Sequence, residues 1–245
     1  MTPATLSVQH LSVHYREKQE DALKDVTLEL MPSERVALLG LNGSGKTTLL
    51  ATIAGLLPFS GSLIVAGECL TPAQTQSIRN KIGFLFSTPD DQLLFPDVLN
   101  DVAFTLERRG IKRAIAQAQA AETLLRLGID ASVPLSPYTL SQGQRQRVAL
   151  AGALIAQPPL LLLDEPSAAL DPVGKESLVW LLREQTAAML IATHDIHFAQ
   201  RIATRFIILE HGRVLTDTTD PDCATDYETQ RIAEVRHRVD PTTKL

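Results

Sequence analysis

The chain has 245 residues, of which 44% are hydrophobic, and its formal net charge is −5 at pH 7. A chain of this length can bury a substantial core, and its acidic balance provides no general basic surface for nucleic acid. The longest apolar stretch, 148–163, is interrupted by Gln157-Pro158-Pro159 and is too short to span a bilayer, and the N-terminus lacks the basic-then-apolar layout of a signal peptide. We therefore expect a cytoplasmic protein that does not bind nucleic acid.

The N-terminal part of the chain is predicted to form strands around one helix. Apolar and polar residues alternate over 5–15, where Tyr15 ends the run, and again over 26–30, which is typical of half-buried antiparallel strands. A continuous apolar run at 36–39 predicts a buried strand. The next predicted elements are a helix at 47–54, a strand at 62–67, a short helix at 74–80 and a strand at 82–86.

From about residue 89 the pattern changes to helices. One is predicted at 97–109 and another at 112–127, where Gly128 ends it. We therefore expect an inserted helical subdomain over about 89–140.

After this segment helices and strands alternate, which favours an α/β fold. The predicted elements are a helix opening near Ser141, a strand at 160–163, a helix at 172–187, strands at 189–192 and 206–209, and a hairpin strand at 213–216. Beyond residue 217 only one weak helix is predicted, at about 226–238. We expect one domain over 1–217 and a short C-terminal tail over 218–245.

A glycine-rich stretch joins the strand at 36–39 to the helix that follows it. Residues 40–47 read Gly-Leu-Asn-Gly-Ser-Gly-Lys-Thr and fit the Gly-x-x-x-x-Gly-Lys-Ser/Thr phosphate-binding pattern in its required strand–loop–helix context. The glycines let the backbone curl so that successive N–H groups form an anion nest at the positive end of the helix. Lys46 would reach the β- and γ-phosphates of ATP, and the Thr47 hydroxyl would ligate Mg²⁺. The predicted nucleotide contacts are Gly40, Asn42, Gly43, Ser44, Gly45, Lys46, Thr47 and Thr48.

A second nucleotide motif follows the apolar strand at 160–163. Asp164 and Glu165 lie at its C-terminal end, where open α/β sheets bind ligands. Asp164 is expected to hold Mg²⁺ through its water shell, and Glu165 to polarise the water that attacks the γ-phosphorus. Apolar strands that end in acidic residues are common, so the pair becomes a strong indication only together with the loop at 40–47.

The order of the motifs resembles that of the ATP-binding cassette (ABC) ATPases. Leu140-Ser141-Gln142-Gly143-Gln144 is similar to the signature sequence of that family. In the family's order, the chain contains Tyr15, the loop at 40–47, the signature, Asp164-Glu165-Pro166, Ser167-Ala168-Ala169-Leu170-Asp171 and Thr193-His194-Asp195. The resemblance covers about residues 5–216. It implies a P-loop NTPase core of RecA type with a mostly parallel sheet, an antiparallel β subdomain and an inserted α-helical subdomain.

The resemblance also implies roles for single residues. Tyr15 would stack on adenine, His194 would contact the γ-phosphate, and Asp171 would lie in a loop that crosses a dimer interface. Tyr15 as an ordinary core or strand-end aromatic stays open as a simpler interpretation.

The signature would act on the nucleotide held by a second subunit. Ser141, Gly143 and Gln144 would bind that nucleotide, so that two chains enclose two ATP molecules. ATP would close the dimer and hydrolysis would reopen it. A serine where a helix begins suits this role, because its hydroxyl, the first N–H groups and the helix dipole can together bind phosphate. The simpler interpretation is that Ser141 is only a helix cap.

The stretch 88–98, with 101–104 after it, is similar to the corresponding region of energy-coupling factor ATPases, the subgroup that drives uptake of cobalt, nickel and vitamins. This resemblance implies a transmembrane coupling protein and a substrate-binding membrane protein as partners, with the chain bound peripherally at the cytoplasmic face of the membrane. Ordinary packing of the helical subdomain is the alternative explanation for some of the apolar residues that would line a groove for a helix of the coupling protein. These residues are Leu93, Leu94, Phe95 and Val98.

The chain departs from the family pattern at three points. Ser87 stands where the family usually has a glutamine, and its side chain is too short to reach both Mg²⁺ and the attacking water. Three explanations stay open: Ser87 works through an intervening water, Gln92 takes the place of the glutamine, or hydrolysis is slower. Gln142 replaces the first of two glycines in the signature, which leaves Gly143 to allow close phosphate approach. The chain also ends soon after the core, where many energy-coupling ATPases continue, so we expect dimerisation to depend more on ATP and membrane partners.

The sequence thus predicts an ATPase subunit that powers import of a small substrate. Two other functions stay open: a non-transport ABC ATPase that acts as a soluble assembly or repair factor, and an ATP-binding module that barely hydrolyses. The resemblance favours cobalt or nickel over a vitamin as the substrate. It leaves open whether the chain forms a homodimer or a heterodimer with a second ATPase.

Overall fold

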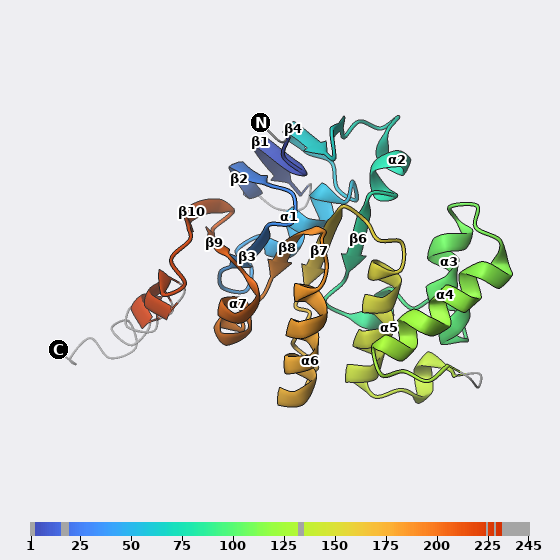
Figure 1. Cartoon of the computed structure of the whole chain (residues 1–245). Coiled ribbons are helices and arrows are strands. Elements are labelled where there is room, and N and C mark those ends of the chain that lie inside the picture. Colours follow the sequence, from blue (N-terminus) through green and yellow to red (C-terminus); the bar gives the residue numbers. More distant parts are fainter. Residues whose placement is uncertain (1–2, 16–19, 132–134, 224, 228, 232–245) are drawn as a thin grey trace.

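Two β-sheets and the helices around them make up the computed structural model, which describes residues 3–15, 20–131, 135–223, 225–227 and 229–231 (Figure 1). Within these residues the central sheet has six strands in the order β10-β9-β3-β8-β7-β6. Neighbouring strands are parallel except β9 and β10, which form an antiparallel hairpin. The strands are β3 (Arg35–Leu39), β6 (Ile82–Leu85), β7 (Leu160–Asp164), β8 (Ala188–Ala192), β9 (Arg205–Glu210) and β10 (Arg213–Thr218).

The second sheet is antiparallel, with the strand order β2-β1-β4-β5. Its strands are β1 (Leu6–His14), β2 (Asp21–Leu30), β4 (Ser60–Val65) and β5 (Glu68–Cys69). Buried and more exposed residues alternate along much of β1 and β2, because one face of this sheet meets the core. All five residues of β7 and of β8 are buried, as expected for central parallel strands that are covered on both faces.

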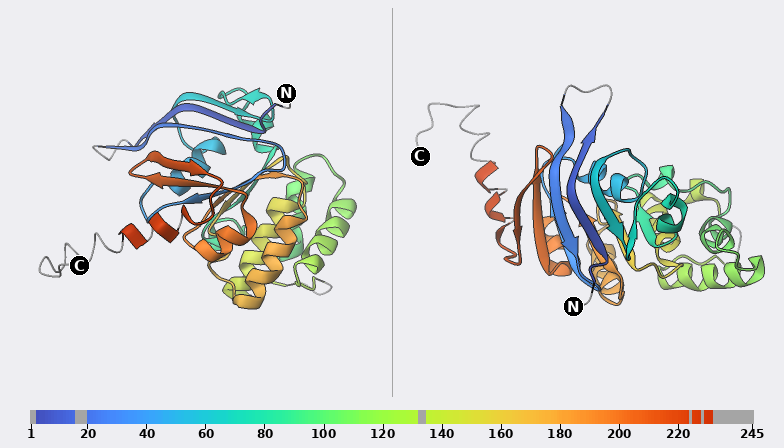
Figure 2. Two further views of the ribbon diagram at one scale, coloured as in Figure 1. Left: turned by 60° about the vertical axis from the view of Figure 1, so that its left-hand side comes forward. Right: turned by 90° about the horizontal axis from the view of Figure 1, so that it is seen from above.

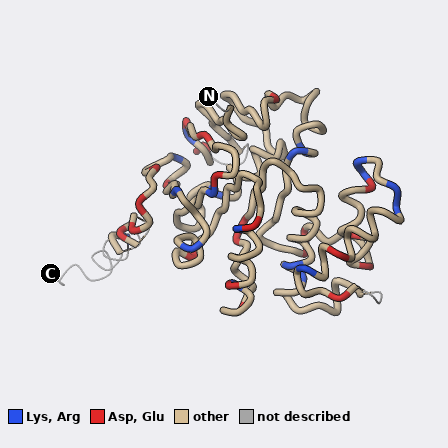
Figure 3. Tube along the Cα trace, in the orientation of Figure 1, with Lys and Arg blue, Asp and Glu red and all other residues tan. Residues whose placement is uncertain are grey.

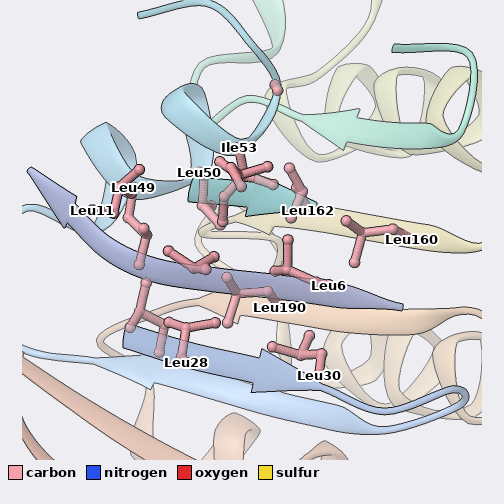
Figure 4. Packing of buried hydrophobic residues seen from close by; sticks show 14 of the residues in the cluster. Leu6, Leu11, Leu28, Leu30, Leu49, Leu50, Ile53, Leu160, Leu162 and Leu190 are labelled. Carbon is pink, nitrogen blue, oxygen red and sulfur yellow. The ribbon is translucent and has the colours of Figure 1, made fainter. Parts of the chain in front are cut away.

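Helix α1 (Lys46–Ile53) lies in the core between the two sheets. Its residues Leu49, Leu50 and Ile53 belong to one apolar cluster with Leu28 of β2 and Leu162 of β7 (Figure 4). Packing on both sides fixes the position of α1, and therefore fixes the loop that precedes it.

The other face of the central sheet is covered by helices (Figure 2). Helix α5 (Gln142–Leu154), α6 (Pro172–Arg183) and α7 (Ile196–Ile202) contribute to the second apolar cluster on this face. Helices α3 (Val98–Glu107) and α4 (Arg113–Arg126) stand to one side of the sheet, next to α5 (Figure 1). The remaining helical turns are α2 (Thr75–Arg79), η1 (Pro89–Asp91) and η2 (Pro137–Thr139).

The predicted α/β fold, with a mostly parallel sheet and a separate antiparallel sheet, is confirmed. The helix predicted at 172–187 ends earlier, at Arg183, because the chain must be extended by Ala188 to pair with Leu160 of β7. Helix α7 was not predicted; the carboxylate of Asp195 caps it by accepting from Phe198 N at 2.9 Å. The helix predicted at 226–238 falls mostly outside the described residues.

Charged residues of both signs are interspersed along the trace (Figure 3). One group of basic residues lies at the turn between α3 and α4 and comprises Arg108, Arg109, Lys112 and Arg113. Among the helices of the described residues, none has the length and apolar content needed to cross a bilayer.

Candidate nucleotide site

The loop between β3 and α1 requires glycine at its two ends. Gly40 has φ +145°, and a Cβ atom there would lie 2.2 Å from the carbonyl oxygen of Leu209. Gly45 has φ +110° and caps α1, and a Cβ atom there would lie 2.9 Å from the carbonyl oxygen of Ala22. A side chain at either position would displace neighbouring backbone, so glycine alone lets the loop curl onto the N-terminus of α1.

Lys46 is folded over this loop and is only 7% exposed. Its Nζ donates to the carbonyl oxygens of Gly40, at 2.8 Å, and Leu41, at 3.3 Å. Burial lowers the pKa of Lys46, while the carboxylates of Glu165 and Asp164 oppose that shift. The ammonium group is therefore held at the phosphate-binding loop by two carbonyl oxygens, and a bound anion can replace these two acceptors.

Thr47 and Asp164 meet at the end of β7. Thr47 Oγ1 donates to Asp164 Oδ2 at 2.7 Å, and Asp164 is 2% exposed. Burial raises the pKa of Asp164; the hydrogen bond from Thr47 lowers it and the neighbouring Glu165 raises it further. A hydroxyl and a buried carboxylate side by side are oxygen ligands of the type that Mg²⁺ takes. No group of three or more His, Cys, Asp or Glu side chains that could hold a metal occurs among the described residues.

Glu165 is held from both sides by the residues that follow β8. Its Oε1 lies 2.9 Å from His194 Nδ1, and its Oε2 accepts from Thr193 Oγ1 at 3.1 Å and from His194 N at 3.4 Å. Its own N–H donates to the carbonyl oxygen of Ala192 at 2.8 Å. Because β7 and β8 are parallel neighbours in the sheet, the residues after them emerge at the same edge.

A cavity of about 820 Å³ brings the predicted residues of this edge together, a volume typical of small-molecule sites. Tyr15 lines it, and its hydroxyl lies 3.2 Å from Thr48 Oγ1. The other predicted residues that line it are Asn42, Gly43, Gly45, Lys46, Thr47, Thr48, Asp164 and Glu165. His194 instead lines a neighbouring cavity of about 250 Å³, together with Asn42 and Gly40. The side chain of Ser44 is buried beside Gly40.

Several residues that line the large cavity were not predicted. His211 and Gly212, at the tip of the β9–β10 hairpin, lie beside the loop, where Gly212 N donates to the carbonyl oxygen of Ser44 at 3.0 Å. The segment 20–24 lies against this hairpin, where Lys24 N donates to the carbonyl oxygen of Gly212 at 2.8 Å, and it lines the cavity through Glu20, Asp21, Ala22 and Lys24. No local pattern marks these residues, since only the long-range packing of the hairpin on the loop brings them here.

Ser87 also lines the large cavity, whereas Gln92 is engaged elsewhere. Gln92 Oε1 accepts from Phe86 N at 3.3 Å, and its Nε2 donates to the carbonyl oxygen of Ala149 on α5 at 2.9 Å. Both ends of the Gln92 amide are therefore used to join the loop to α5. This arrangement disfavours Gln92 as the substitute for the missing glutamine.

The residues of the predicted signature lie outside the large cavity, at the N-terminus of α5. Ser141 Oγ accepts from Gln144 N at 3.3 Å and Gln144 Oε1 accepts from Ser141 N at 2.9 Å, which is a reciprocal capping box. A Cβ atom on Gly143 would lie 2.9 Å from the carbonyl oxygen of Ala169. Gly143 is thus needed where the loop 167–171 packs on α5.

The apolar residues predicted to line a groove are only partly accessible. Val98 is fully buried in the core of the helical segment, and Leu93 packs against that core. Leu94 is 77% exposed. Asp101 Oδ1 accepts from the N–H groups of Leu94, at 2.8 Å, and Phe95, at 2.9 Å, which holds this turn on α3. Packing therefore explains Val98 and Leu93, and Leu94 is the residue presented to solvent.

Comparisons with known proteins agree along most of the chain. A family model described as ABC transporter matches residues 23–168. The energy-coupling factor transporter ATP-binding protein EcfA1 of Levilactobacillus brevis is 38% identical over 237 residues, which cover 95% of this chain and 84% of that protein. The EcfA1 of Lacticaseibacillus paracasei is 40% identical over 214 residues, which cover 85% of this chain and 77% of that protein.

Solved structures show the same likeness. The structure of cbiO1 from Clostridium perfringens, described as part of the ABC transporter complex cbiONQ, superposes with a TM-score of 0.78 at 31% identity, over 96% of this chain and 95% of that one. A bacterial ABC transporter cassette solved as a dimer superposes with a TM-score of 0.80 at 30% identity, over 87% of this chain and 98% of that one.

Proposed function

This chain belongs to the ABC transporter family as an ATP-hydrolysing subunit of the energy-coupling factor type, and we propose that it powers the import of a cobalt or nickel ion or a vitamin. One observation carries the catalytic part of this proposal: Lys46, Thr47, Asp164 and Glu165 line a single cavity. A phosphate-binding lysine, oxygen ligands for a divalent cation and an adjacent carboxylate are the groups that hydrolysis of a nucleoside triphosphate needs.

Binding of ATP uses the nest formed by residues 40–47. The ammonium group of Lys46 exchanges its bonds to the Gly40 and Leu41 carbonyl oxygens for bonds to the β- and γ-phosphates. Tyr15 stacks on the adenine ring, and its contact with Thr48 fixes the ring of the tyrosine beside the phosphate loop.

The donor set fits Mg²⁺, because two hard oxygen ligands, Thr47 Oγ1 and Asp164 Oδ2, lie 2.7 Å apart. The buried carboxylate of Asp164 also has a raised pKa, which a nearby cation would lower. When bound, Mg²⁺ supplies charge neutralisation at the β- and γ-phosphates. Thr47 and Asp164 are the residues that would hold it.

Hydrolysis uses Glu165 as general base. The carboxylate takes a proton from water, the water oxygen bonds to the γ-phosphorus, and the bond from that phosphorus to the bridging oxygen breaks to release ADP and phosphate. His194, 2.9 Å from Glu165 Oε1, orients the carboxylate and contacts the γ-phosphate. Ser87 lines the large cavity together with Glu165 and acts through an intervening water.

Two chains are needed for a complete site. Ser141, Gly143 and Gln144 stand at the N-terminus of α5, outside the large cavity. They bind the nucleotide of a partner subunit through the Ser141 hydroxyl, the Gly143 N–H and the side-chain amide nitrogen of Gln144, together with the helix dipole. The loop ending at Asp171 crosses the interface. ATP therefore closes a dimer, with a second copy or a second ATPase, and hydrolysis opens it.

Coupling to the membrane uses the exposed turn around Leu94. We place a helix of a transmembrane coupling protein against this turn, with Phe95 packed on Phe104 at 5.0 Å between ring centroids as its support. The chain is thereby bound peripherally at the cytoplasmic face of the membrane, in a complex with a substrate-binding membrane protein.

The catalytic part is tested by Glu165→Gln. We expect ATP turnover to fall at least about 100-fold while ATP still binds, because the amide cannot accept the proton from water. Glu184→Gln is the matched control, since Glu184 is a 63% exposed glutamate at the end of α6. Unchanged turnover in Glu165→Gln would exclude Glu165 as the base.

The transport part is tested by affinity purification of the tagged chain from native membranes, followed by mass spectrometry. We expect a polytopic coupling protein and a small substrate-binding membrane protein to co-purify, and Leu94→Asp to lose both while retaining ATP hydrolysis. Recovery of soluble partners alone would contradict the importer and favour an assembly factor.

A further inference from the structure

One ion pair joins helix α6 to the loop that carries His194. Lys175, in the first turn of α6, has its Nζ 2.5 Å from Asp195 Oδ2. The side chains are 37% and 18% exposed, so water screens the pair only in part. Burial tends to raise the pKa of Asp195, but the hydrogen bonds from Lys175 and Phe198 N lower it overall, so the carboxylate stays ionised near neutral pH.

Asp195 connects onward to Glu165 through Thr193. The N–H of Asp195 donates to Thr193 Oγ1 at 3.0 Å, and that hydroxyl donates to Glu165 Oε2 at 3.1 Å. Thr193 is fully buried, and its one hydroxyl proton is directed at Glu165 while its oxygen accepts from Asp195. The N–H of Asp195 therefore helps to fix the orientation of the Thr193 hydroxyl that donates to one oxygen of Glu165.

The other end of the connection lies at the start of α6. Asp171 caps this helix, because its Oδ1 accepts from Gly174 N at 2.7 Å, and its carbonyl oxygen accepts from Lys175 N at 2.9 Å. Lys175 is thus one helical turn from the loop 167–171. A second ion pair, between Glu176 of α6 and Arg201 of α7, holds the two helices together nearby.

We propose that Lys175 and Asp195 are positioning residues for hydrolysis: their ion pair holds the 193–195 loop against α6 and so sets the orientation of Glu165 toward the attacking water. Neither residue is among the described residues that line the nucleotide cavity. This inference rests on the proposed role of Glu165 as base.

The first test replaces Lys175 by methionine, which keeps the length of the side chain and the helix propensity but removes the charge. We expect kcat for ATP hydrolysis to fall about tenfold, because a base displaced by a fraction of an ångström loses its alignment. The KM for ATP stays unchanged, because the phosphate contacts of residues 40–47 are untouched. Lys175→Arg restores most of kcat, since a guanidinium can also pair with Asp195.

A matched control comes from a comparable ion pair far from the site. Lys81 and Glu68 lie 2.8 Å apart with side-chain exposures of 27% and 34%. Lys81→Met removes a partly buried pair of the same kind, and we expect kcat and KM to stay at their wild-type values. A fall in kcat of the same size in both methionine variants would show a general loss of stability and overturn the proposal.

A double-mutant cycle tests whether Lys175 and Asp195 act together. Asp195→Asn removes the charge but can still cap α7, because asparagine is as good an N-cap as aspartate. If the pair acts as a unit, the double variant Lys175→Met with Asp195→Asn is no slower than the slower single variant. Fully additive losses would show that the two residues act independently and would overturn the proposal.

The outcomes separate this inference from the proposed function. If Glu165→Gln abolishes turnover while Lys175→Met and Asp195→Asn leave kcat unchanged, the base assignment stands and the positioning role fails. If Glu165→Gln leaves turnover unchanged, the proposed function fails first. A rise in KM with unchanged kcat in Lys175→Met would indicate a role in nucleotide binding and would also overturn the positioning role.

Discussion

At the scale of single residues, Asp164 and Glu165 are neighbours in the chain but occupy different environments. Asp164 is the last residue of β7 and is 2% exposed, whereas the Glu165 side chain is 16% exposed. Glu165 has φ 50°, a left-handed conformation that costs about 1 kcal/mol or more for a residue with a side chain. This backbone bend directs one carboxylate to Thr47 and the other to the 193–195 loop, which allows two different roles.

Replacement of Asp164 by asparagine should stabilise the nucleotide-free protein while it abolishes ATP hydrolysis. The folded-state pKa of Asp164 is raised above 3.8, so this group favours the folded state at low pH and loses that contribution as pH rises from about 3.8 through the raised pKa. Asparagine does not ionise and still accepts from Thr47. We expect the Tm of Asp164→Asn to exceed that of the wild type by about 2–4 °C near neutral pH.

Thermal unfolding of both proteins from about pH 3.8 upward to neutral pH, without nucleotide, measures this difference. The gap in Tm should widen as pH rises within the range over which Asp164 loses its proton. A variant that is less stable than the wild type at every pH would show that the carboxylate stabilises the empty site.

At the scale of secondary-structure elements, the start of α5 serves the helix as well as the proposed partner nucleotide. The capping box uses the side chains of both Ser141 and Gln144, so these residues have a structural role in the single chain. The simpler interpretation of Ser141 as a cap is thus correct for its geometry, and the phosphate-binding role is an additional proposal.

Ser141→Ala should lower the free energy of unfolding by about 1 kcal/mol, because the N–H of Gln144 loses its acceptor. Ser141→Asn should regain most of that stability, since asparagine is an equally good cap. Urea unfolding of the nucleotide-free variants measures both values. Equal losses in the two variants would contradict the capping role, whereas low ATP turnover in the stable asparagine variant would support a separate role in the partner site.

At the scale of the whole molecule, Arg205 at the start of β9 joins the two sheets. Its guanidinium contacts Asp217 of β10 at 2.6 Å through both Nε and Nη2, Glu34 at 3.1 Å, and the carbonyl oxygen of Glu29 on β2 at 3.0 Å. The hydrogen bonds that Arg205 donates to the Asp217 carboxylate raise the pKa of Arg205, so its charge is permanent. One side chain therefore links the hairpin that braces the phosphate loop to the antiparallel sheet.

Arg205→Met should lower the free energy of unfolding by about 2 kcal/mol, because it leaves Asp217 and Glu34 without their shared partner. Arg213→Met is the matched control, since Arg213 is exposed on the adjacent strand β10. Denaturant unfolding should show a lower midpoint with an unchanged slope in Arg205→Met alone. Equal midpoints in the two variants would contradict the link between the sheets.

Much of this architecture could be predicted because its signals are local. The loop at 40–47 lies between a strand and a helix as expected, and the apolar run before Asp164 forms a buried strand. Helix α7 has a weak local signal, because it has only seven residues and its N-cap, Asp195, also belongs to the motif at 193–195. Helix α6 ends before the predicted residue because strand pairing at Ala188, a long-range effect, overrides helix propensity in the preceding residues.

The sequence by itself determined that the ligand is a nucleoside triphosphate, since the order of the glycines, Lys46, Thr47 and the Asp164-Glu165 pair can be recognised without knowledge of the fold. Only the tertiary structure decided which side chains meet. The register that pairs Asp164 with Ala192 brings Glu165 beside Thr193 and His194. The packing of the phosphate loop and the β9–β10 hairpin places Ser87 and His211 at the cavity. Gln92, in contrast, is held on α5. These contacts join residues far apart in the chain, so they depend on sheet order and packing, which no local pattern encodes.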